Sequence, residues 1–174
     1  KVADVSIATN QSYKEIATNR GGMESENVFI VRSGPNLDRV KILPPKKDLK
    51  HGKNFLIGYV GVIGKQEGID HLLKAISIVV KKHNRNDIHC IVCGGGTELD
   101  SMINLNTMLG LDGFVNFTGR IPDKELFEIM NTADICVNPD VWNEMNDKST
   151  MNKIMEYMAL GKPIVQYDLK EGRF

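Results

Sequence analysis

Apolar runs typical of buried strands alternate with segments of helical periodicity along the second two thirds of the chain. The strand-like runs are residues 55–61, 88–93, 114–117, 135–138 and 163–167. The segments with helical periodicity are residues 69–82, 98–109 and 123–131, and a fourth helix lies within 148–161. Five strands separated by four helices predict an α/β fold with a doubly wound parallel sheet. In such sheets ligands bind outside the carboxyl ends of the strands.

The fourth helix has the clearest pattern. Its apolar stripe consists of Met151, Ile154, Met155, Met158 and Ala159. We expect this stripe to be packed in the core, with Ser149, Asn152 and Glu156 on the opposite side. Ser149 or Thr150 is expected to cap the start, and Gly161 followed by Pro163 ends the helix. The unpaired N–H groups of the first turn would suit a phosphate.

The first third of the chain is organised differently. Residues 5–8 and 27–31 are strand-like, residues 11–18 are helical, and residues 33–36 form a turn. Residues 37–53 are rich in Lys and Pro and resemble a linker. We therefore expect residues 1–36 to end one domain and contain a hinge, and residues 54–174 to form a second domain. Because the chain begins inside a strand-like segment, we expect it to be a piece of a longer protein, truncated at its C-terminus.

Composition narrows the functional classes. The 174 residues contain 22 Lys and Arg and 22 Asp and Glu, so no basic field indicates nucleic acid. No apolar run reaches the length of about 18 residues that a membrane span needs. Cys90, Cys93 and Cys136 lie in apolar runs and are expected in the core; across a strand Cys90 and Cys93 should face opposite sides. An odd cysteine count without a secretory segment indicates a cytoplasmic setting, and a peripheral position of the full-length protein at the inner membrane face stays open as an alternative.

The predicted carboxyl ends of the strands carry the candidate binding residues. Gly64 and Lys65 follow the first strand, a run of three glycines (residues 94–96) follows the second, and Arg120 with Ile121 follows the third. Gly64-Lys65 is not a P-loop, because Tyr59 and Gln66 stand where that motif needs Gly and Ser or Thr. Each feature has a plain structural alternative: a tight turn for the glycines and a solvated surface position for Arg120 or Glu156. The four histidines show no ligand spacing, so no metal site is assigned.

The order of these motifs resembles the nucleotide-sugar half of a GT-B glycosyltransferase of family 4. The matching segments are Gly61 with Gly68-Ile69-Asp70-His71-Leu72-Leu73-Lys74-Ala75, then Gly94–Gly96, then Phe117-Thr118-Gly119-Arg120-Ile121 with Leu126, then Ala133-Asp134 with Pro139, and finally Glu156-Tyr157-Met158-Ala159-Leu160-Gly161-Lys162-Pro163-Ile164-Val165. Ala3-Asp4 and Lys14 resemble the end of the acceptor-side domain, and Gly34 the hinge. The resemblance implies a Rossmann-like donor-binding domain for residues 54–174.

The resemblance also implies a function. It is that of a transferase that moves a sugar from a nucleotide diphosphate sugar to an unknown acceptor, with retention at the anomeric carbon. The nucleotide sugar is a substrate; no cofactor and no metal are implied. Glu156 would bind the ribose hydroxyls, Ser149 and Thr150 the diphosphate, Arg120 and Ile121 would border the base, and Gly95 with its neighbours would line the cleft. The partner would be a missing N-terminal acceptor domain, without which we expect donor binding but no transfer.

Three charged positions depart from the family pattern. Lys148 stands where the family usually has an acid, Val62 where it has an arginine, and Glu67 where it has a lysine. One hypothesis is that Lys148 and Lys65 supply the cations lost at positions 62 and 67. A catalytically inactive relative is the alternative.

Two other functional classes remain open at this point. A nucleotide-sugar epimerase of the same fold would need carboxylates or a histidine near the sugar, and no histidine falls at a predicted strand end. A non-catalytic nucleotide- or protein-binding module of receiver type would need paired acids after the first strand of the sheet. Residues 59–64 contain no such pair.

Overall fold

The computed structural model describes residues 3–173. The predicted start of the first domain at residue 1 and the predicted end of the second domain at residue 174 lie outside this range. The main feature of the structure is a five-stranded parallel sheet with the strand order β5-β4-β3-β6-β7. The strands are β3 (Phe55–Val60), β4 (Ile88–Cys93), β5 (Val115–Gly119), β6 (Ile135–Asn138) and β7 (Ile164–Gln166). The predicted doubly wound parallel α/β fold is therefore confirmed.

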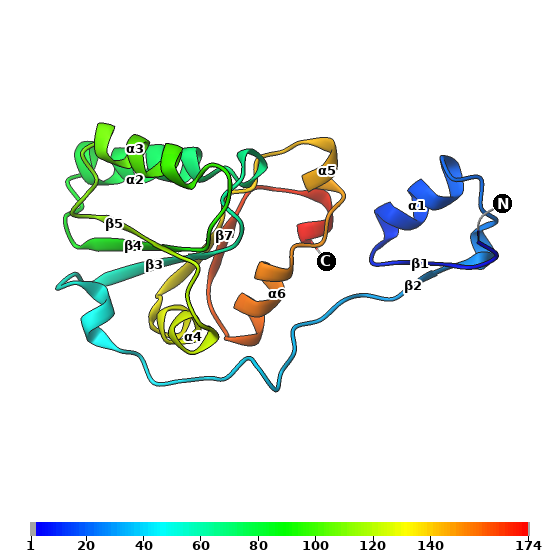
Figure 1. The fold of residues 1–174 in the computed structure, drawn as a ribbon, viewed down its shortest axis with the longest axis horizontal. Helices are drawn as coiled ribbons and strands as arrows, with labels where there is room; N and C mark the ends of the chain where they lie inside the picture. Colours follow the sequence, from blue (N-terminus) through cyan, green and yellow to red (C-terminus); the bar gives the residue numbers. More distant parts are fainter. Residues whose placement is uncertain (1–2, 174) are drawn as a thin grey trace.

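Helices cover both faces of this sheet. Helices α2 (Ile69–Lys82) and α3 (Leu99–Met108) lie on one face, and α4 (Asp123–Thr132) and α6 (Asn152–Ala159) lie on the other (Figure 1). Alternating apolar side chains of the strands fill a separate core on each face. Cys90 belongs to one core and Cys93 to the other, as predicted. Burial raises the pKa of Cys93 to about 11 and that of Cys136 to about 12, so both are thiols at neutral pH.

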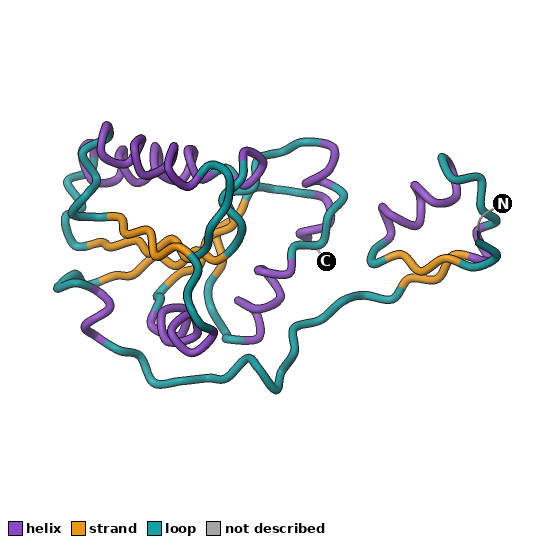
Figure 2. The backbone as a smooth tube through the Cα atoms, viewed as in Figure 1, coloured by secondary structure: helices purple, strands orange, loops and turns teal. Residues whose placement is uncertain are grey.

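A small N-terminal unit precedes the sheet. Strands β1 (Ser6–Ala8) and β2 (Val28–Ile30) pair in parallel, with α1 (Gln11–Asn19) and the 3₁₀ turn η1 (Ser25–Asn27) between them. A long extended segment then leads to the 3₁₀ turn η2 (Lys47–Lys50) and to β3 (Figure 2). This segment is held against α4, because the N–H groups of Leu43 and Lys46 donate to the side chains of Asn131 and Thr132, each at 2.9 Å.

The start of α6 differs from the prediction. The helix begins at Asn152 after Met151, whose side chain makes no capping hydrogen bond. Ser149 and Thr150 lie before the helix, so the prediction that one of them caps it was wrong. A further short helix, α5 (Glu144–Asp147), occupies part of the loop between β6 and α6, and the 3₁₀ turns η3 (Lys65–Glu67) and η4 (Lys170–Arg173) complete the chain.

The buried face of α6 also differs from the prediction. Tyr157 is fully buried; its hydroxyl accepts from the Val60 N–H at 2.9 Å and donates to the Val137 carbonyl at 3.3 Å. Met158, in contrast, is 64% exposed. Of the predicted apolar stripe, Ile154 and Ala159 pack against the core as expected. The expectation was wrong for the three methionines, because a tyrosine with two backbone partners on the sheet sets the rotation of the helix.

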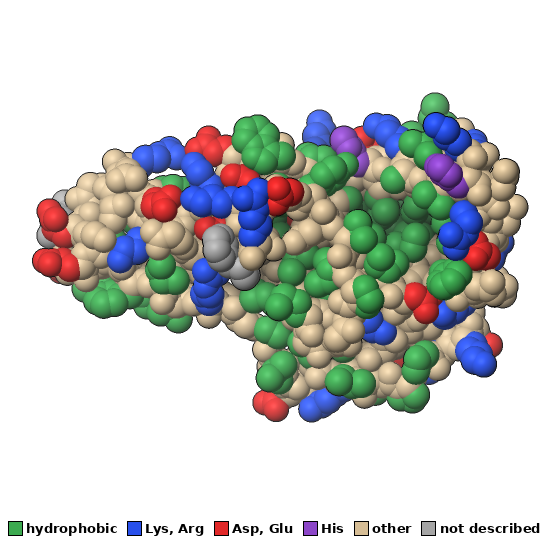
Figure 3. All heavy atoms as spheres, turned by 180° about the vertical axis from the view of Figure 1, so that it is seen from behind, with side chains coloured by type: hydrophobic (Ala, Val, Ile, Leu, Met, Phe, Trp, Pro, Cys, Tyr) green, Lys and Arg blue, Asp and Glu red, His purple; other side chains and the backbone are tan. Residues whose placement is uncertain are grey.

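Exposed hydrophobic side chains occur on both units, for example Phe29 on the N-terminal unit and Trp142 on the sheet-bearing unit. Seen from behind, this unit shows many hydrophobic side chains around a hollow in its face (Figure 3). Within residues 3–173, no helix combines the length and the apolar character that crossing a bilayer requires.

Candidate functional site

The carboxyl ends of β3 and β4 approach each other closely enough to require glycine. A Cβ atom on Gly94, whose φ is 136°, would lie 1.8 Å from the Gly61 carbonyl oxygen. One on Gly96 would lie 2.3 Å from the carbonyl oxygen of Ile63. At Gly95 the nearest atom is Cγ of Arg120, at 3.4 Å. Gly94 and Gly96 thus allow the loops after β3 and β4 to approach each other closely, and Gly95 lies beside Arg120, a predicted binding residue.

A pocket of about 230 Å³ opens at this end of β3, β4 and β5. It is lined by Arg39, Val60, Cys93, Gly94, Arg120, Ile121, Asp123 and Leu126. The structure therefore brings Arg120 and Ile121 together with the glycine run, as the sequence predicted. The pocket combines apolar and charged side chains at the carboxyl ends of parallel strands, which is where ligands bind in sheets of this kind.

Glu156 lies next to this pocket. Its carboxylate is 3.6 Å from Nη1 of Arg39, one of the pocket residues, and its side chain is 21% exposed. Burial raises the pKa of Glu156, and the charge of Arg39 opposes that shift. A half-buried carboxylate beside a pocket can accept hydrogen bonds from ligand hydroxyls.

Arg39 is a site residue that the sequence did not reveal. Its Nε and Nη2 atoms donate to the two carboxylate oxygens of Asp123 at 2.5 and 2.7 Å, and its guanidinium lies 5.6 Å from the centre of the Phe127 ring. It belongs to the Lys- and Pro-rich stretch interpreted as a linker, where no local pattern marks it. Its partners are more than 80 positions away in the sequence.

The hydroxyl groups before α6 are in contact with α1. The Ser149 hydroxyl lies 2.8 Å from the Tyr13 hydroxyl and donates to the Met145 carbonyl at 2.6 Å. The Thr150 hydroxyl accepts from the Asn10 amide at 3.0 Å. The segment expected to hold a diphosphate thus lies where the N-terminal unit meets the sheet-bearing unit.

Lys148 and Lys65, the two lysines expected to replace the cations lost at positions 62 and 67, lie in different surroundings. Lys148 forms an ion pair with Glu144 at 2.7 Å. Lys65 is exposed and, with Gly64, lines a hollow of about 310 Å³ that also contains Asp70 and Glu98. Among the described residues neither of these two carboxylates lies within ion-pair distance of Lys65.

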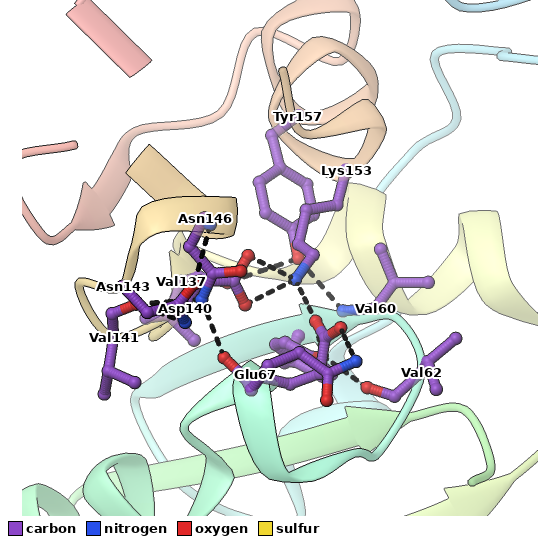
Figure 4. A network of polar contacts seen from close by, with 12 residues as sticks. Val60, Val62, Glu67, Val137, Asp140, Val141, Asn143, Asn146, Lys153 and Tyr157 are labelled. Carbon is purple, nitrogen blue, oxygen red and sulfur yellow. Dashed lines mark hydrogen bonds and ion pairs between the residues drawn. The ribbon is translucent and has the colours of Figure 1, made fainter. Parts of the chain in front are cut away.

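Lys153 is a cation that the sequence reading missed, and it is held in a network at the start of α6 (Figure 4). Its ammonium lies 2.7 Å from Oε2 of Glu67 and 2.8 and 3.1 Å from the two oxygens of Asp140. It also lies 5.1 Å from the centre of the Tyr59 ring. The three charged side chains are 10%, 15% and 2% exposed for Lys153, Glu67 and Asp140. The charge of Glu67 is therefore neutralised by Lys153 of α6. The sequence signal for such a cation was Glu67 itself, an acid at a position where the resembled family has a lysine.

The network joins two loops at the rim of the sheet. Asn146 donates to the carbonyls of Gln66 and Val141 at 3.0 and 2.8 Å, next to the ion pairs of Lys153 (Figure 4). Burial raises the pKa of Asp140 to about 6, against the opposing effect of Lys153. The loop before α6 and the turn η3 are thus fixed to each other by charged groups with little exposure. Within residues 3–173, no cluster of three or more His, Cys, Asp or Glu is placed to bind a metal ion.

Comparison with known proteins identifies the family. Residues 54–173 match the family model described as glycosyl transferases group 1. The chain belongs to this family.

The relatives of this group 1 chain are distant and longer. It is 30% identical over 115 residues to D-inositol 3-phosphate glycosyltransferase of Corynebacterium jeikeium, covering 63% of this chain and 26% of that protein. It is 27% identical over 175 residues to 2-deoxystreptamine glucosyltransferase of Streptomyces kanamyceticus, covering 96% and 43%. The chain thus spans between about a quarter and less than half of the length of these curated relatives.

Solved structures share its fold. HepE of Anabaena in complex with UDP superposes with a TM-score of 0.77 at 21% identity, covering 98% of this chain and 46% of that one. Sucrose-phosphate synthase of Thermosynechococcus elongatus gives a TM-score of 0.72 at 22% identity, covering 94% and 40%. At these identities the likeness shows the fold of the group 1 chain.

Proposed function

We propose that this chain is the donor-binding part of a retaining glycosyltransferase of family 4 and binds a nucleotide diphosphate sugar. The observation that carries the proposal is the pocket of about 230 Å³ at the ends of β3, β4 and β5, with Glu156 beside it. The base would lie between Arg120 and Ile121, and Glu156 would accept hydrogen bonds from the ribose hydroxyls. Membership of the group 1 family and the UDP bound by the Anabaena neighbour support this choice.

The diphosphate would lie towards the start of α6. Thr150 and the N–H groups of the first helical turn would be the donors there, joined by Ser149 when its hydroxyl turns away from the Met145 carbonyl. Because Tyr13 of α1 and its N-cap residue Asn10 contact these hydroxyls, the N-terminal unit would border the donor. We propose that residues 3–36 are the end of an acceptor-binding domain and that transfer needs the remainder of that domain.

The proposal also needs cations that bind the diphosphate. Lys148 and Lys65 are the candidates from the sequence, because Lys153 is neutralised by two carboxylates. Charged hydrogen bonds to phosphate contribute roughly 1.5–3 kcal/mol each. Lys148→Ala or Lys65→Ala should therefore weaken donor binding about tenfold or more. If calorimetry finds the donor affinity unchanged in both variants, these lysines do not hold the phosphates.

The general test is ligand-induced stabilisation. A panel of UDP-, GDP- and ADP-sugars is added to the chain and the thermal unfolding temperature is measured. A donor at 100 times its Kd should stabilise the fold by about 2.7 kcal/mol. Glu156→Gln should abolish most of this shift, whereas Glu128→Gln, at a carboxylate of similar exposure on α4, should leave it unchanged. The proposal fails if no member of the panel raises the unfolding temperature.

A further inference from the structure

The other flank of α6 borders a second cavity, of about 400 Å³. Met155 and Met158 line it from α6, Met151 from the position before the helix, and Gln166 from the end of β7, with Leu169 after it. The pocket at the ends of β3, β4 and β5, proposed above to hold the base and ribose, is called the nucleoside pocket. None of the eight residues that line it lines the second cavity. The sheet order explains the separation, because the nucleoside pocket lies at β5-β4-β3 and the second cavity at β6-β7.

Two buried polar side chains line this cavity without a full set of hydrogen-bond partners. Asn138, at the end of β6, is 1% exposed, and neither its amide nitrogen nor its amide oxygen has a partner among the described residues. Glu171 is 3% exposed; its Oε1 accepts from the N–H and hydroxyl of Ser12, at 3.1 and 2.6 Å, and its Oε2 has no partner in residues 3–173. A buried polar atom without a partner destabilises the fold unless something in the cavity forms a hydrogen bond to it.

The chemistry of the wall specifies the kind of ligand. Asn138 offers an NH2 group that can donate twice and a carbonyl oxygen that accepts, and Oε2 of Glu171 is an acceptor that requires an O–H or N–H donor. The methionines and Leu169 offer a flexible apolar surface. A ligand must therefore present several hydroxyl groups on one edge and C–H groups on its face. The volume lies within the range of small-molecule sites.

We propose that this cavity binds a sugar ring, with ring hydroxyls on Asn138 and Glu171 and the ring face on Met155 and Met158. Ser149 and Thr150 line the cavity as well, so it adjoins the proposed diphosphate segment. The inference rests on the proposed function for the source of the sugar, which is either the transferred sugar of the donor or a separate acceptor. Binding of a free ring to the cavity does not itself depend on the nucleotide.

The experiment uses methionine methyl groups as reporters. The chain labelled with ¹³C-methyl methionine is titrated with methyl α-D-glucopyranoside and followed by NMR. The methyl signals of Met151, Met155 and Met158 should move together, with a Kd in the range of about 1–10 mM. The proposal is overturned if these three signals stay in place while the sugar is raised through that range.

Two variants give independent checks. Asn138→Leu replaces an unpartnered amide by an apolar group of similar size, so the fold should be kept while sugar affinity falls at least about tenfold. Met155→Trp fills the cavity and should also abolish binding, so the test survives if one variant does not fold. Unchanged sugar affinity in either folded variant overturns the proposal.

Controls separate this inference from the proposed function and identify the source of the sugar. Glu156→Gln should weaken nucleotide binding and leave glucoside binding unchanged. If the ring is the donor's own sugar, Met155→Trp weakens UDP-glucose but not UDP, and UDP-glucose displaces the glucoside. If the ring is an acceptor, the glucoside binds together with UDP-glucose. Loss of glucoside binding in Glu156→Gln would contradict a separate site, whatever the nucleotide does.

Discussion

At the scale of single residues, the site is shaped by charges whose partners lie far apart in the sequence. Lys153 pairs with Glu67, 86 positions earlier, and Arg39 pairs with Asp123, 84 positions later. Both cations hold structural segments together as well as lying near the proposed ligand. Their removal should therefore change stability as well as binding.

Lys153→Met should leave Glu67 and Asp140 facing each other without a cation. Breaking a buried ion pair by removing one partner costs about 3–5 kcal/mol. Lys148→Met removes a cation from a more exposed pair with Glu144 and should cost at most about 1 kcal/mol. Urea unfolding at pH 7 measures both changes. Equal, small losses in the two variants would show that the network does not support the fold.

The raised pKa of Asp140 predicts that the stability of the fold depends on pH. Burial raises its pKa in the folded chain from 3.8 to about 6, so the folded state binds the proton more tightly than the unfolded state. The contribution of this proton to stability is complete below pH about 4 and is lost as the pH rises through 6. In Asp140→Asn this contribution is absent. The stability of the native chain relative to the variant should therefore fall between pH 4 and 7 in urea titrations, and a rise would contradict the assignment.

At the scale of elements, the loops that build the rim depend on close backbone approach. Gly94→Ala would place a Cβ atom 1.8 Å from the Gly61 carbonyl oxygen, and the two loops would have to separate. Gly119 also has a positive φ, of 66°, but nothing lies within 4 Å of its added Cβ. Gly119→Ala should therefore cost about 1–2 kcal/mol of backbone strain, and Gly94→Ala clearly more. Equal denaturation midpoints for the two variants would disprove the role of close approach.

The elements show how far sequence reasoning reaches. The ranges of α2, β4 and β6 were predicted correctly because uninterrupted apolar runs and a 3.6-residue period are local signals. The rotation of α6 was not predictable from periodicity, because Tyr157 and Lys153 take the sheet side through bonds to Val60, Val137, Glu67 and Asp140. Of the candidate site, Arg120, Ile121 and the glycines converge as expected, since parallel strands bring their carboxyl ends to one edge. Arg39 and Lys153 depend on contacts between distant segments and were missed.

At the scale of the whole molecule, the N-terminal unit is joined to the sheet-bearing unit by a small set of polar contacts. Asn10 caps α1 through the Tyr13 N–H at 2.8 Å and also donates to the Lys148 carbonyl at 2.9 Å and to Thr150. Glu171 of η4 accepts from the first turn of α1 through Ser12. Any movement of α1 would therefore be transmitted to the segment before α6.

Asn10→Ala should loosen this junction. Loss of an N-cap costs about 0.5–2 kcal/mol, and here two contacts with residues 148–150 are lost with it. Amide hydrogen exchange should become faster throughout α1 and at residues 148–150. Asn19→Ala, at the exposed far end of α1, is the matched control and should leave the exchange at residues 148–150 unchanged. Protection that stays the same in Asn10→Ala would show that the contacts do not hold the units together.

The central claim is that Glu156 binds the ribose of a nucleotide at the rim of the sheet. It is tested most directly by calorimetric titration of the native chain and Glu156→Gln with UDP and with 2′,3′-dideoxy-UDP. The native chain should bind UDP at least about tenfold more tightly than the dideoxy analogue, and Glu156→Gln should bind the two with nearly equal affinity. If Glu156→Gln keeps the full preference for the ribose hydroxyls, or if the native chain has none, the carboxylate does not contact the ribose and the proposed placement of the donor is wrong.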